Sequence, residues 1–326
     1  MAQDWRPTAD LATLRLRAAL LTRARAFFAA RAVLEVDTPL VINAPASDVH
    51  IESAQVLFPG DTQARFLHTS PEYAMKRLLA AGSGDIFQIC HVVRGLERGR
   101  HHNSEFTLIE WYRLNFSLDA LMDEVAALLG HLLPAGTHAL RVQKRSYREV
   151  FREHIQLDPL TTDIPTLREA ARRAGYESDT LPAEPAELRD ELLQMLMGSL
   201  IGPRLGTDAL CFVHGYPASQ AALARLDSGE PRTALRFELY YRGVELANGF
   251  HELASAAEQR QRFQLDNEVR RARGMPVYPP DERMLAALGA GLPECAGVAL
   301  GFDRVVMLAA GAATIADVLA FPTERA

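Results

Sequence analysis

Residues 94–113, RGLERGRHHNSEFTLIEWYR, place the strongest limit on what this chain can form. The first half of the stretch is dense in arginine and histidine. The second half alternates, with Glu110 and Tyr112 on one parity and Ile109 and Trp111 on the other. Because successive side chains of a strand face opposite sides, the segment predicts a strand that packs on a core with one face and borders a polar pocket with the other. Cations ahead of carboxylates and a tyrosine indicate a site that holds an anion beside an amine.

Strand-like and helical segments succeed one another along the rest of the chain. We expect a strand at 33–41, a long antiparallel hairpin at 86–113, and a second hairpin at 236–253 that turns at Gly243. Segments with the apolar spacing of a helix, or with helix-start signals, are 11–31, 70–79 (with Ser70 as N-cap and Pro71 in the first turn), 117–133, 256–273 and 303–311. This order favours an α+β fold with an antiparallel sheet flanked by helices over a doubly wound parallel sheet.

The length of 326 residues suits one large domain. We expect a single catalytic domain over residues 1–326 with a mostly helical insertion at about 145–205, where the composition becomes rich in Arg and Glu. The net charge of −6 argues against a surface built to grip nucleic acid, which needs clustered Lys and Arg.

The expected location is the cytoplasm, with no membrane partner. No apolar run is long enough to cross a bilayer, and the Arg-rich start is expected to be a structural helix and not a targeting segment. Cys90, Cys211 and Cys295 lie far apart without metal-type spacing, as expected for reduced thiols.

Arg94 closes the first strand of the predicted hairpin. A guanidinium there offers a planar fork of donors to a phosphate or carboxylate. The alternative is a surface ion pair with Glu97 or Glu105, which contributes little to stability. Taken alone, the residue favours this alternative.

Glu238, Glu245 and Glu252 recur every seven residues across the second hairpin. Carboxylates held close together repel one another unless a divalent cation or an ammonium lies among them. The alternative is a solvated outer face, and the spacing leaves both interpretations open.

The segment GVALGFDR, residues 297–304, carries glycines at 297 and 301 that leave backbone open to a flat ligand. Arg304 follows at a helix start, where it can stack on a base and pair with a phosphate. The alternative is a tightly packed strand–helix turn with Arg304 exposed. Neither G-x-x-x-x-G-K-[ST] nor G-x-G-x-x-G occurs in the chain.

Together and in this order, VLEVDTPLV, the 86–113 hairpin and GVALGFDR resemble the three signature motifs of class II aminoacyl-tRNA synthetases. The resemblance covers nearly the whole chain and is closest to lysyl-tRNA synthetases, through TSPEYAMKRLL, RHHNSEFTLIEWYR and RFELYYRGVELANGFHEL. It implies the class II catalytic domain, an antiparallel sheet flanked by helices. It also implies a homodimer, because the first motif usually forms the dimer interface in that class.

Ser70 in TSPE, and Ala299 where the synthetases carry Gly, resemble the elongation factor P–(R)-β-lysine ligases, which are synthetase paralogues without the anticodon-binding domain. Since the sequence starts at the helix before the first motif, we expect no anticodon-binding barrel and no tRNA substrate. The resemblance implies an ATP-dependent, AMP-forming ligase that uses Mg²⁺. It would activate (R)-β-lysine or lysine as an adenylate and transfer it to a lysine side chain of elongation factor P.

The same resemblance implies the site residues. Arg94 and Arg304 would be catalytic. The substrate would be bound by Ser70, Pro71, Glu72, Glu110, Tyr112, Asn248, Phe250, Glu252 and Ala299. ATP would be bound by Arg94, Gly95, Leu96, His102, Asn103, Phe106, Glu245, Leu246, Gly301 and Arg304. Magnesium would be held by Glu238 and Glu245.

One departure from the family pattern lies directly after Arg94. The family's second motif reads Phe-Arg-Asn-Glu, and this chain has Val-Arg-Gly-Leu at 93–96, so a glutamate that helps to position ATP is missing. Glu97 would point to the opposite side of a regular strand, whereas a bulge at Gly95 would bring it round.

Two other functions stay open on the sequence. One is a synthetase-like ligase that acts on tRNA or on a small amine. The other, motivated by Leu96, is a non-catalytic sensor that binds an adenylate or an amino acid.

Overall fold

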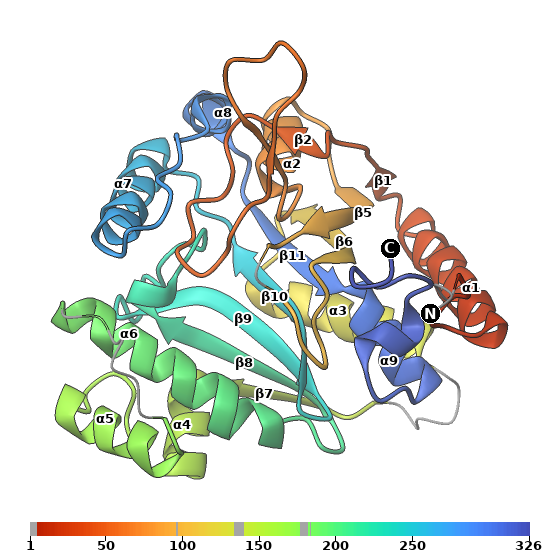
Figure 1. The fold of residues 1–326 in the computed structure, drawn as a ribbon. Helices are drawn as coiled ribbons and strands as arrows, with labels where there is room; N and C mark the ends of the chain where they lie inside the picture. Colours follow the sequence, from red (N-terminus) through yellow and green to blue (C-terminus); the bar gives the residue numbers. More distant parts are fainter. Residues whose placement is uncertain (1–4, 96, 134–139, 177–181, 183) are drawn as a thin grey trace. The chain divides into compact units, whose positions relative to one another are not determined.

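The computed structural model describes residues 5–95, 97–133, 140–176, 182 and 184–326. The chain divides into two compact units, a first unit of residues 1–137 and 252–326 and a second unit of residues 138–251 (Figure 1).

The first unit is built on four strands in the order β1 (Leu34–Glu35), β5 (Ile86–Val93), β6 (Glu105–Leu114) and β11 (Cys295–Gly301). Strand β6 pairs antiparallel with both β5 and β11, so the hairpin predicted over 86–113 is confirmed. Strand β1 pairs parallel with β5. A separate small antiparallel sheet has the order β2 (Val41–Ile42), β4 (Arg65–Leu67), β3 (Gln55–Val56).

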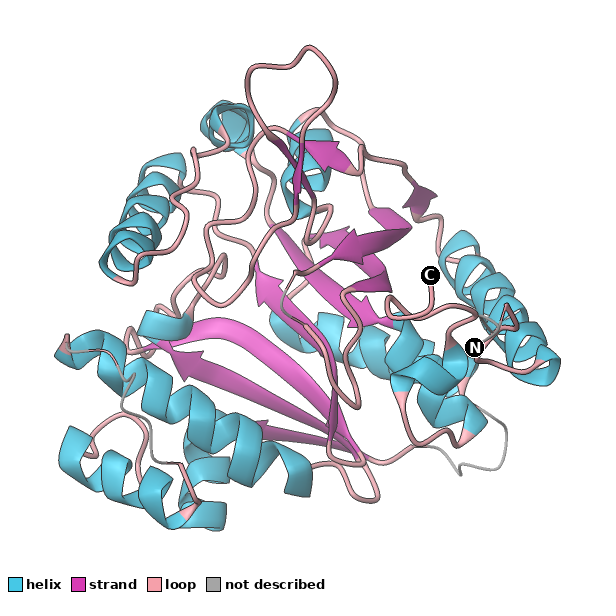
Figure 2. Cartoon of the chain, in the orientation of Figure 1, coloured by secondary structure: helices cyan, strands magenta, loops and turns pink. Residues whose placement is uncertain are grey.

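Helices cover both faces of the strands in the first unit (Figure 2). They are α1 (Leu11–Ala29), α2 (Glu72–Ala80), α3 (Leu118–Leu132), α7 (Ala256–Ala272), α8 (Glu282–Gly291), α9 (Phe302–Ala310) and the 3₁₀ turn η4 (Ile315–Val318). On one face, Phe28 of α1 stacks on Phe87 at 4.4 Å and meets Trp111 edge-on at 5.3 Å. On the other face, Met75 of α2 and Met284 of α8 join one buried cluster with the β-strands.

This arrangement explains the alternation along β6. Trp111 points toward α1 and α3, where its ring N–H donates to Glu124 Oε2 at 3.1 Å. Tyr112, one residue later, belongs to the cluster under α2 and α8. One face of β6 is therefore core, and the face that carries Glu110 and Tyr112 is the one that can border a site.

Capping side chains start three of the helices in the first unit. Asp10, Ser117 and Ser255 each occupy an N-cap and accept a backbone N–H from Thr13, Ala120 and Glu258, respectively. Such caps typically contribute about 1 kcal/mol each to stability. The helices predicted at 11–31, 117–133 and 256–273 are confirmed, with ends that differ by one or two residues.

The second unit holds strands in the order β10 (Val244–His251), β9 (Thr233–Tyr241), β8 (Leu210–Pro217) and β7 (Val142–Ser146), antiparallel except for the parallel pair β7–β8. Its helices are α4 (Tyr147–Ile155), α5 (Ile164–Arg173) and α6 (Pro185–Leu196), with short turns at Met197–Ile201, Gly202–Arg204 and Ala218–Gln220. The β9–β10 hairpin is confirmed. Gly243 sits at its turn with φ +71, and a Cβ there would lie 2.6 Å from the Pro203 carbonyl oxygen.

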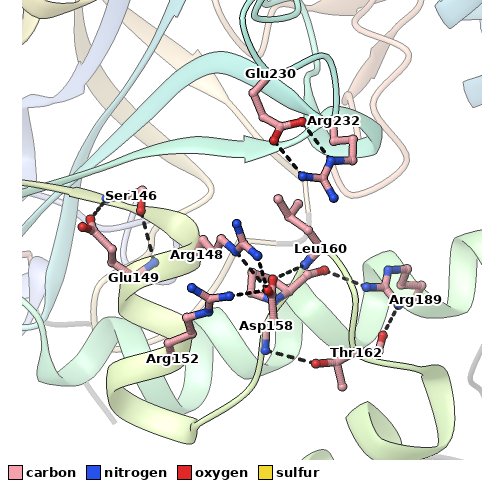
Figure 3. Close-up of polar contacts among 11 residues, drawn as sticks. Ser146, Arg148, Glu149, Arg152, Asp158, Leu160, Thr162, Arg189, Glu230 and Arg232 are labelled. Atoms are coloured by element: carbon pink, nitrogen blue, oxygen red, sulfur yellow. Dashed lines mark hydrogen bonds and ion pairs between the residues drawn. The ribbon is translucent and has the colours of Figure 1, made fainter.

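A polar clamp joins α4 to the turn ahead of α5 (Figure 3). Asp158 accepts hydrogen bonds from Arg148 Nη2 at 2.6 Å, Arg152 Nη2 at 2.7 Å and the N–H of Leu160 at 3.1 Å. Burial on its own would raise the pKa of Asp158, but the Arg148, Leu160 and Arg152 hydrogen bonds lower that pKa to about 2. Arg189 extends the clamp to α6 by donating to the Pro159 carbonyl at 2.7 Å.

Several expectations about single elements need correction. The strand predicted at 33–41 is wrong in extent, because only Leu34–Glu35 and Val41–Ile42 pair and Pro39 lies in the stretch between them. The helix expected from Ser70 starts at Glu72, and Pro71 takes the N-cap position without a side-chain cap. Helix α8 and strands β7 and β8 were not predicted.

The fold class is confirmed as α+β, with mostly antiparallel strands flanked by helices. Helices α4–α6 fall inside the 145–205 segment expected to be helical, while the description as a single domain stays a prediction. Within the described ranges, no helix has the length and apolar character needed to cross a membrane.

Candidate active site

Carboxylates gather on the β6 face that carries Glu110 and Tyr112. Ser70 Oγ donates to Glu110 Oε2 at 2.7 Å, and the Tyr112 hydroxyl donates to Glu110 Oε1 at 2.8 Å. Ser70 Oγ also accepts the N–H of Glu72 at 3.0 Å, which ties the start of α2 to the strand. Glu110 is thus a buried carboxyl group with both oxygens engaged.

Strand β11 forms the adjacent wall of this cluster. Gly297 is paired with Tyr112 and Ala299 with Glu110, so the Ala299 methyl lies on the same face as the Glu110 side chain. A Cβ at Gly297 would lie 2.3 Å from Tyr112 Cε1 and 2.6 Å from Glu252 Oε1. Only glycine leaves room there for both side chains.

Sequence reasoning missed Lys76, which lies inside the cluster. Its Nζ is 2.7 Å from Glu72 Oε1 and 2.7 Å from Glu252 Oε2, and its side chain is 0% exposed. The i,i+4 spacing on α2 signals the contact with Glu72. No local signal could have indicated Glu252, which comes from a distant part of the chain.

The protonation of this cluster is strongly perturbed. Burial, reinforced by the Glu72 charge, raises the pKa of Glu110 to about 8. Burial also raises the pKa of Glu252 to about 7, although Lys76 pulls it down. For Lys76, burial alone would lower the pKa, but Glu252 and Glu72 outweigh it and raise the pKa above its ordinary value. The cluster therefore keeps its own ammonium and holds protons near neutral pH, as expected of a site short of cations.

Arg94 lies where β5 ends. Its Nη1 is 3.1 Å from Glu97 Oε1, its Nε donates to the Thr69 carbonyl at 3.3 Å, and its guanidinium carbon is 5.1 Å from the centre of the Phe106 ring. The ion pair with Glu97 weighed as an alternative is therefore present. Thr69 directly precedes Ser70, so Arg94 borders the segment that also contacts Glu110.

The chain turns directly after Arg94. The N–H of Gly95 donates to the Glu52 carbonyl at 2.8 Å, and the N–H of Glu97 donates to the Arg94 carbonyl at 3.3 Å. Through this turn, and not through a bulge in the strand pairing, the Glu97 carboxylate comes to lie beside Arg94. Leu96, assigned to ATP by resemblance, lies outside the described residues.

Glu52 is itself held firmly. Arg270 Nη2 lies 2.9 Å from Glu52 Oε2, and the Tyr278 hydroxyl donates to Glu52 Oε1 at 3.0 Å. Arg270 is fully buried, lies over the Tyr278 ring at 4.1 Å and also donates to the Asp48 carbonyl at 2.9 Å. The end of α7 thereby fixes the backbone against which Gly95 rests.

The loop from 94 to 104 is fastened to the C-terminal segment. Arg304 Nε donates to the His101 carbonyl at 3.2 Å, and Arg100 Nε donates to the Ala313 carbonyl at 2.9 Å. The N–H of Thr323 donates to Asn103 Oδ1 at 3.1 Å. Gly301, which ends β11 opposite Leu108, precedes the helix that carries Arg304.

His102 lies among these charged groups. Burial lowers its pKa, and the positive charge of Arg304 lowers it further while Glu97 acts in the opposite direction. The surroundings of His102 therefore favour its neutral imidazole form. The effect of Arg304, Arg94 and Glu97 on one ring shows that the ends of the second and third motifs meet in the first unit.

The second unit carries the remaining predicted residues, on β9 and β10. Arg236 Nε donates to Asn248 Oδ1 at 3.2 Å, its guanidinium carbon lies 6.0 Å from the Phe250 ring centre, and it pairs with Glu238. The Tyr240 hydroxyl donates to Glu238 Oε2 at 2.6 Å. Glu245 is paired opposite Tyr240, so it shares a face with Glu238, whereas Leu246 is buried.

The three evenly spaced glutamates are divided between the two units. Glu238 and Glu245 belong to the second unit, while Glu252 belongs to the first and lies against Lys76. Within the described parts of both units, no group of three or more His, Cys, Asp or Glu side chains could hold a metal ion.

Comparison with known proteins finds similarity over nearly the whole chain. The family model for class II tRNA synthetases (D, K and N) matches residues 3–325. Proteins named elongation factor P–(R)-beta-lysine ligase from Salmonella paratyphi A and Salmonella schwarzengrund are each 48% identical to this chain over 326 residues. Each alignment covers 99% of this chain and 98% of the relative.

Proposed function

The chain belongs to the class II tRNA synthetase family (D, K and N), and from this premise we propose that it is an ATP-dependent ligase acting on elongation factor P. It activates (R)-β-lysine, or lysine, as an adenylate and transfers the aminoacyl group to a lysine side chain of that protein. Full-length similarity to ligases supports the reaction type.

One observation carries the choice of substrate. Glu72, Glu110 and Glu252 converge in a buried cluster with Ser70 and Tyr112. Buried carboxylates are costly unless cations or hydrogen-bond donors compensate them. An amino acid with two ammonium groups supplies two positive charges and their N–H donors to these carboxylates. An amino acid with an apolar side chain supplies only one ammonium group.

Activation joins the substrate carboxylate to ATP. A carboxylate oxygen attacks the α-phosphorus, a carbon–oxygen–phosphorus linkage forms, and the bond to pyrophosphate breaks. We assign Arg94 and Arg304 to the charge that develops on the phosphates, with adenine stacked on Phe106 and bordered by His102 and Asn103. Arg94 would exchange its Glu97 partner for phosphate in this step.

Transfer forms the amide bond. The neutral ε-amine of the acceptor lysine attacks the activated carbonyl, AMP departs with the electron pair of the broken bond, and the new amide nitrogen loses a proton to solvent. Both steps depend on positioning and charge neutralisation, so no nucleophilic Ser or Cys is required.

We assign Mg²⁺ to Glu245 and Glu238. The two carboxylates share a face beside Tyr240, and magnesium is commonly held by one or two carboxylates plus phosphate oxygens and water. Bound there, the ion would neutralise phosphate charge. Glu238 would have to release its contact with Arg236 or Tyr240 to become a ligand.

Pyrophosphate exchange tests the activation step. Purified protein with ATP and Mg²⁺ should incorporate labelled pyrophosphate into ATP in the presence of (R)-β-lysine or lysine, and much less with leucine. A folded protein that supports no exchange with either amino acid would contradict the proposal and favour a non-catalytic sensor.

Mass spectrometry of elongation factor P tests the acceptor. We expect the protein to gain the mass of one lysine residue at a single lysine after incubation. Parallel reactions with tRNA and with small amines test the other ligase functions. Charging of tRNA with no change in elongation factor P would overturn the assignment of the acceptor.

A homodimer and a cytoplasmic location belong to the same proposal. The homodimer is supported by the resemblance of residues 33–41 to the first class II motif. The cytoplasmic location is supported by the proposed acceptor, which is an elongation factor. Sedimentation velocity and cell fractionation test them.

A further inference from the structure

Lys76 carries a buried ammonium group to which the proposed reaction assigns no role. Its Nζ lies 2.7 Å from Glu72 Oε1 and 2.7 Å from Glu252 Oε2, so the ammonium pairs with both carboxylates. Among the described residues, the second carboxylate oxygen of Glu252, Oε1, has no hydrogen bond of good geometry. A buried carboxylate oxygen is rarely left so, and Glu252 Oε1 therefore points to a ligand that completes the cluster.

Lys76 connects two separate parts of the first unit. Glu72 lies one helical turn before it on α2. Glu252 follows the second hairpin, and its N–H donates to the Cys295 carbonyl of β11 at 3.0 Å. The Lys76 ammonium thus contacts both the Glu72 carboxylate of α2 and the Glu252 carboxylate beside β11. The separation of those two carboxylates depends on it.

The charges of the cluster can be counted. Glu72, Glu110 and Glu252 supply three negative charges when ionised, and Lys76 supplies one positive charge. Two negative charges remain. A diamino acid brings two ammonium groups, so it completes the balance, whereas a monoamine leaves one carboxylate to hold a proton.

We propose that Lys76 is a specificity-determining positioning residue. It fixes the separation of Glu72 and Glu252 and cancels one of three negative charges, which leaves the site matched to a substrate with two ammonium groups. This inference rests on the proposed function and deepens it, because it names the feature that selects a diamino acid.

The groups that face Lys76 decide how the site responds to pH. Glu72 from α2, Glu252 from the segment after β10 and Cys295 from β11 interact with Lys76 directly. Glu110 and Tyr112 from β6 interact in turn with Glu72 and Glu252. Without the Lys76 charge, one more carboxylate in this set holds a proton at neutral pH. A diamine must then displace that additional proton on binding.

Lys76→Met removes the charge and keeps the length of the side chain. We expect KM for (R)-β-lysine in pyrophosphate exchange to rise about 30-fold, with KM for ATP and kcat changed by less than about threefold. The rise of kcat/KM with pH should move upward by about one pH unit. Lys76→Arg, which keeps the charge, should recover most of the affinity.

Calorimetry in two buffers of different ionisation enthalpy counts the protons released when (R)-β-lysine binds, and it does not depend on catalysis. Lys76→Met should release about one proton more than the wild type. Discrimination between (R)-β-lysine and 6-aminohexanoate, which has one amine, should fall about tenfold in the same variant. Lys144→Met in the second unit makes the same chemical change elsewhere and should alter none of these values.

A wild-type proton count and KM in Lys76→Met would overturn the inference. So would a parallel rise of KM for ATP and for (R)-β-lysine, because that pattern marks a purely structural role. If Lys76→Met does not fold, Lys76→Gln supplies a neutral side chain that can still bridge the carboxylates, and the same proton count decides. Wild-type protein that binds (R)-β-lysine but supports no exchange would contradict the proposed function and leave this test intact.

Discussion

At Gly297 a single hydrogen atom in place of a methyl group leaves room for Tyr112 and Glu252 in the proposed amine-binding end of the site. A Cβ there would lie 2.3 Å from the Tyr112 ring and 2.6 Å from Glu252. We expect Gly297→Ala to cost about 2–3 kcal/mol of unfolding free energy and to raise KM for the amino acid, because both side chains must move. Gly130→Ala is the control, since a Cβ at that helical position meets nothing within 4 Å and should be neutral or slightly stabilising. Urea unfolding of the two variants makes the comparison, and equal effects would contradict it.

Glu97 is the residue best placed to replace the glutamate missing from the second motif. Its carboxylate is 3.1 Å from Arg94 Nη1. We expect Glu97→Gln to raise KM for ATP about tenfold in pyrophosphate exchange while leaving KM for the amino acid nearly unchanged. Glu105→Gln, an exposed glutamate paired with His91, should leave both constants unchanged. Wild-type ATP binding in Glu97→Gln would show that the contact is only a surface ion pair.

At the scale of elements, the loop between β5 and β6 depends on the C-terminal segment for its position. Arg100 makes two of the links, donating from Nε to Ala313 and accepting the N–H of Ile315 at its carbonyl, each at 2.9 Å. We expect Arg100→Ala to raise KM for ATP about three- to tenfold with little change in melting temperature, because the loop loses its side-chain link but no core contact. Arg98→Ala, exposed in the same loop, is the control. Equal kinetics in the two variants would argue against the role of the link.

The Asp158 clamp gives a pH-dependent prediction for the helices of the second unit. Hydrogen bonds from two arginines and a backbone N–H outweigh burial and depress the pKa of Asp158 from 3.8 to about 2. The stabilising effect of ionised Asp158 on the folded protein is therefore present above pH 3.8 and is lost as the pH falls toward 2. We expect Asp158→Asn to lose about 1–2 kcal/mol in urea unfolding at pH 7, after allowance for solvent screening.

The loss of unfolding free energy in Asp158→Asn should be smaller when urea unfolding is repeated near pH 3. Glu230→Gln removes one partner of the exposed pair with Arg232 (Figure 3) and should produce no measurable change. A loss in Asp158→Asn that does not depend on pH would show that the clamp acts through shape and not through charge.

At the scale of the whole molecule, the ligand-free protein should lose stability in mildly alkaline solution. Burial raises the pKa of Glu110 from 4.5 to about 8 and that of Glu252 to about 7. Both pKa values lie above those of the unfolded chain, so the stabilising effect is complete below 4.5 and is lost as the pH rises through 7 and 8. We expect the melting temperature to fall by about 2–4 °C between pH 6 and pH 9.

Addition of (R)-β-lysine should remove most of that fall, because its ammonium groups pair with the ionised carboxylates. Differential scanning fluorimetry across this range provides the measurement. Glu110→Gln should flatten the pH dependence of the ligand-free protein. An equally steep fall in that variant would place its origin elsewhere in the molecule.

The elements that could be predicted from the sequence are those with local signals. Alternation defined β6, apolar spacing defined helices such as α3, and Gly243 marked a turn that requires positive φ, whereas the one cap predicted, Ser70, is not the N-cap of α2. Strand β1 was overestimated because only two of its residues find a partner, in β5. Strands β7 and β8 pair in parallel although they are distant in the sequence, so neither segment alone contains a signal that predicts the pairing.

The candidate site divides in the same way. Motif resemblance supplied Arg94, Glu110, Tyr112 and Glu252, and the contacts among the last three are consistent with one cluster, while their roles remain proposals. Lys76 was not predicted as a site residue, because its contact with Glu252 is formed only in the folded protein. The three evenly spaced glutamates are divided between the two units, so a common role for them stays a prediction.

The support beneath Gly95 has a consequence for large-scale mutagenesis. Glu52 and Arg270 lie outside the three signature motifs, yet they hold the backbone on which the turn after Arg94 rests. In a screen that scores every substitution by ligase output, both positions should tolerate change as poorly as the motif arginine itself. Maps of intolerance drawn from such a screen would therefore outline the scaffold of the site together with its chemistry.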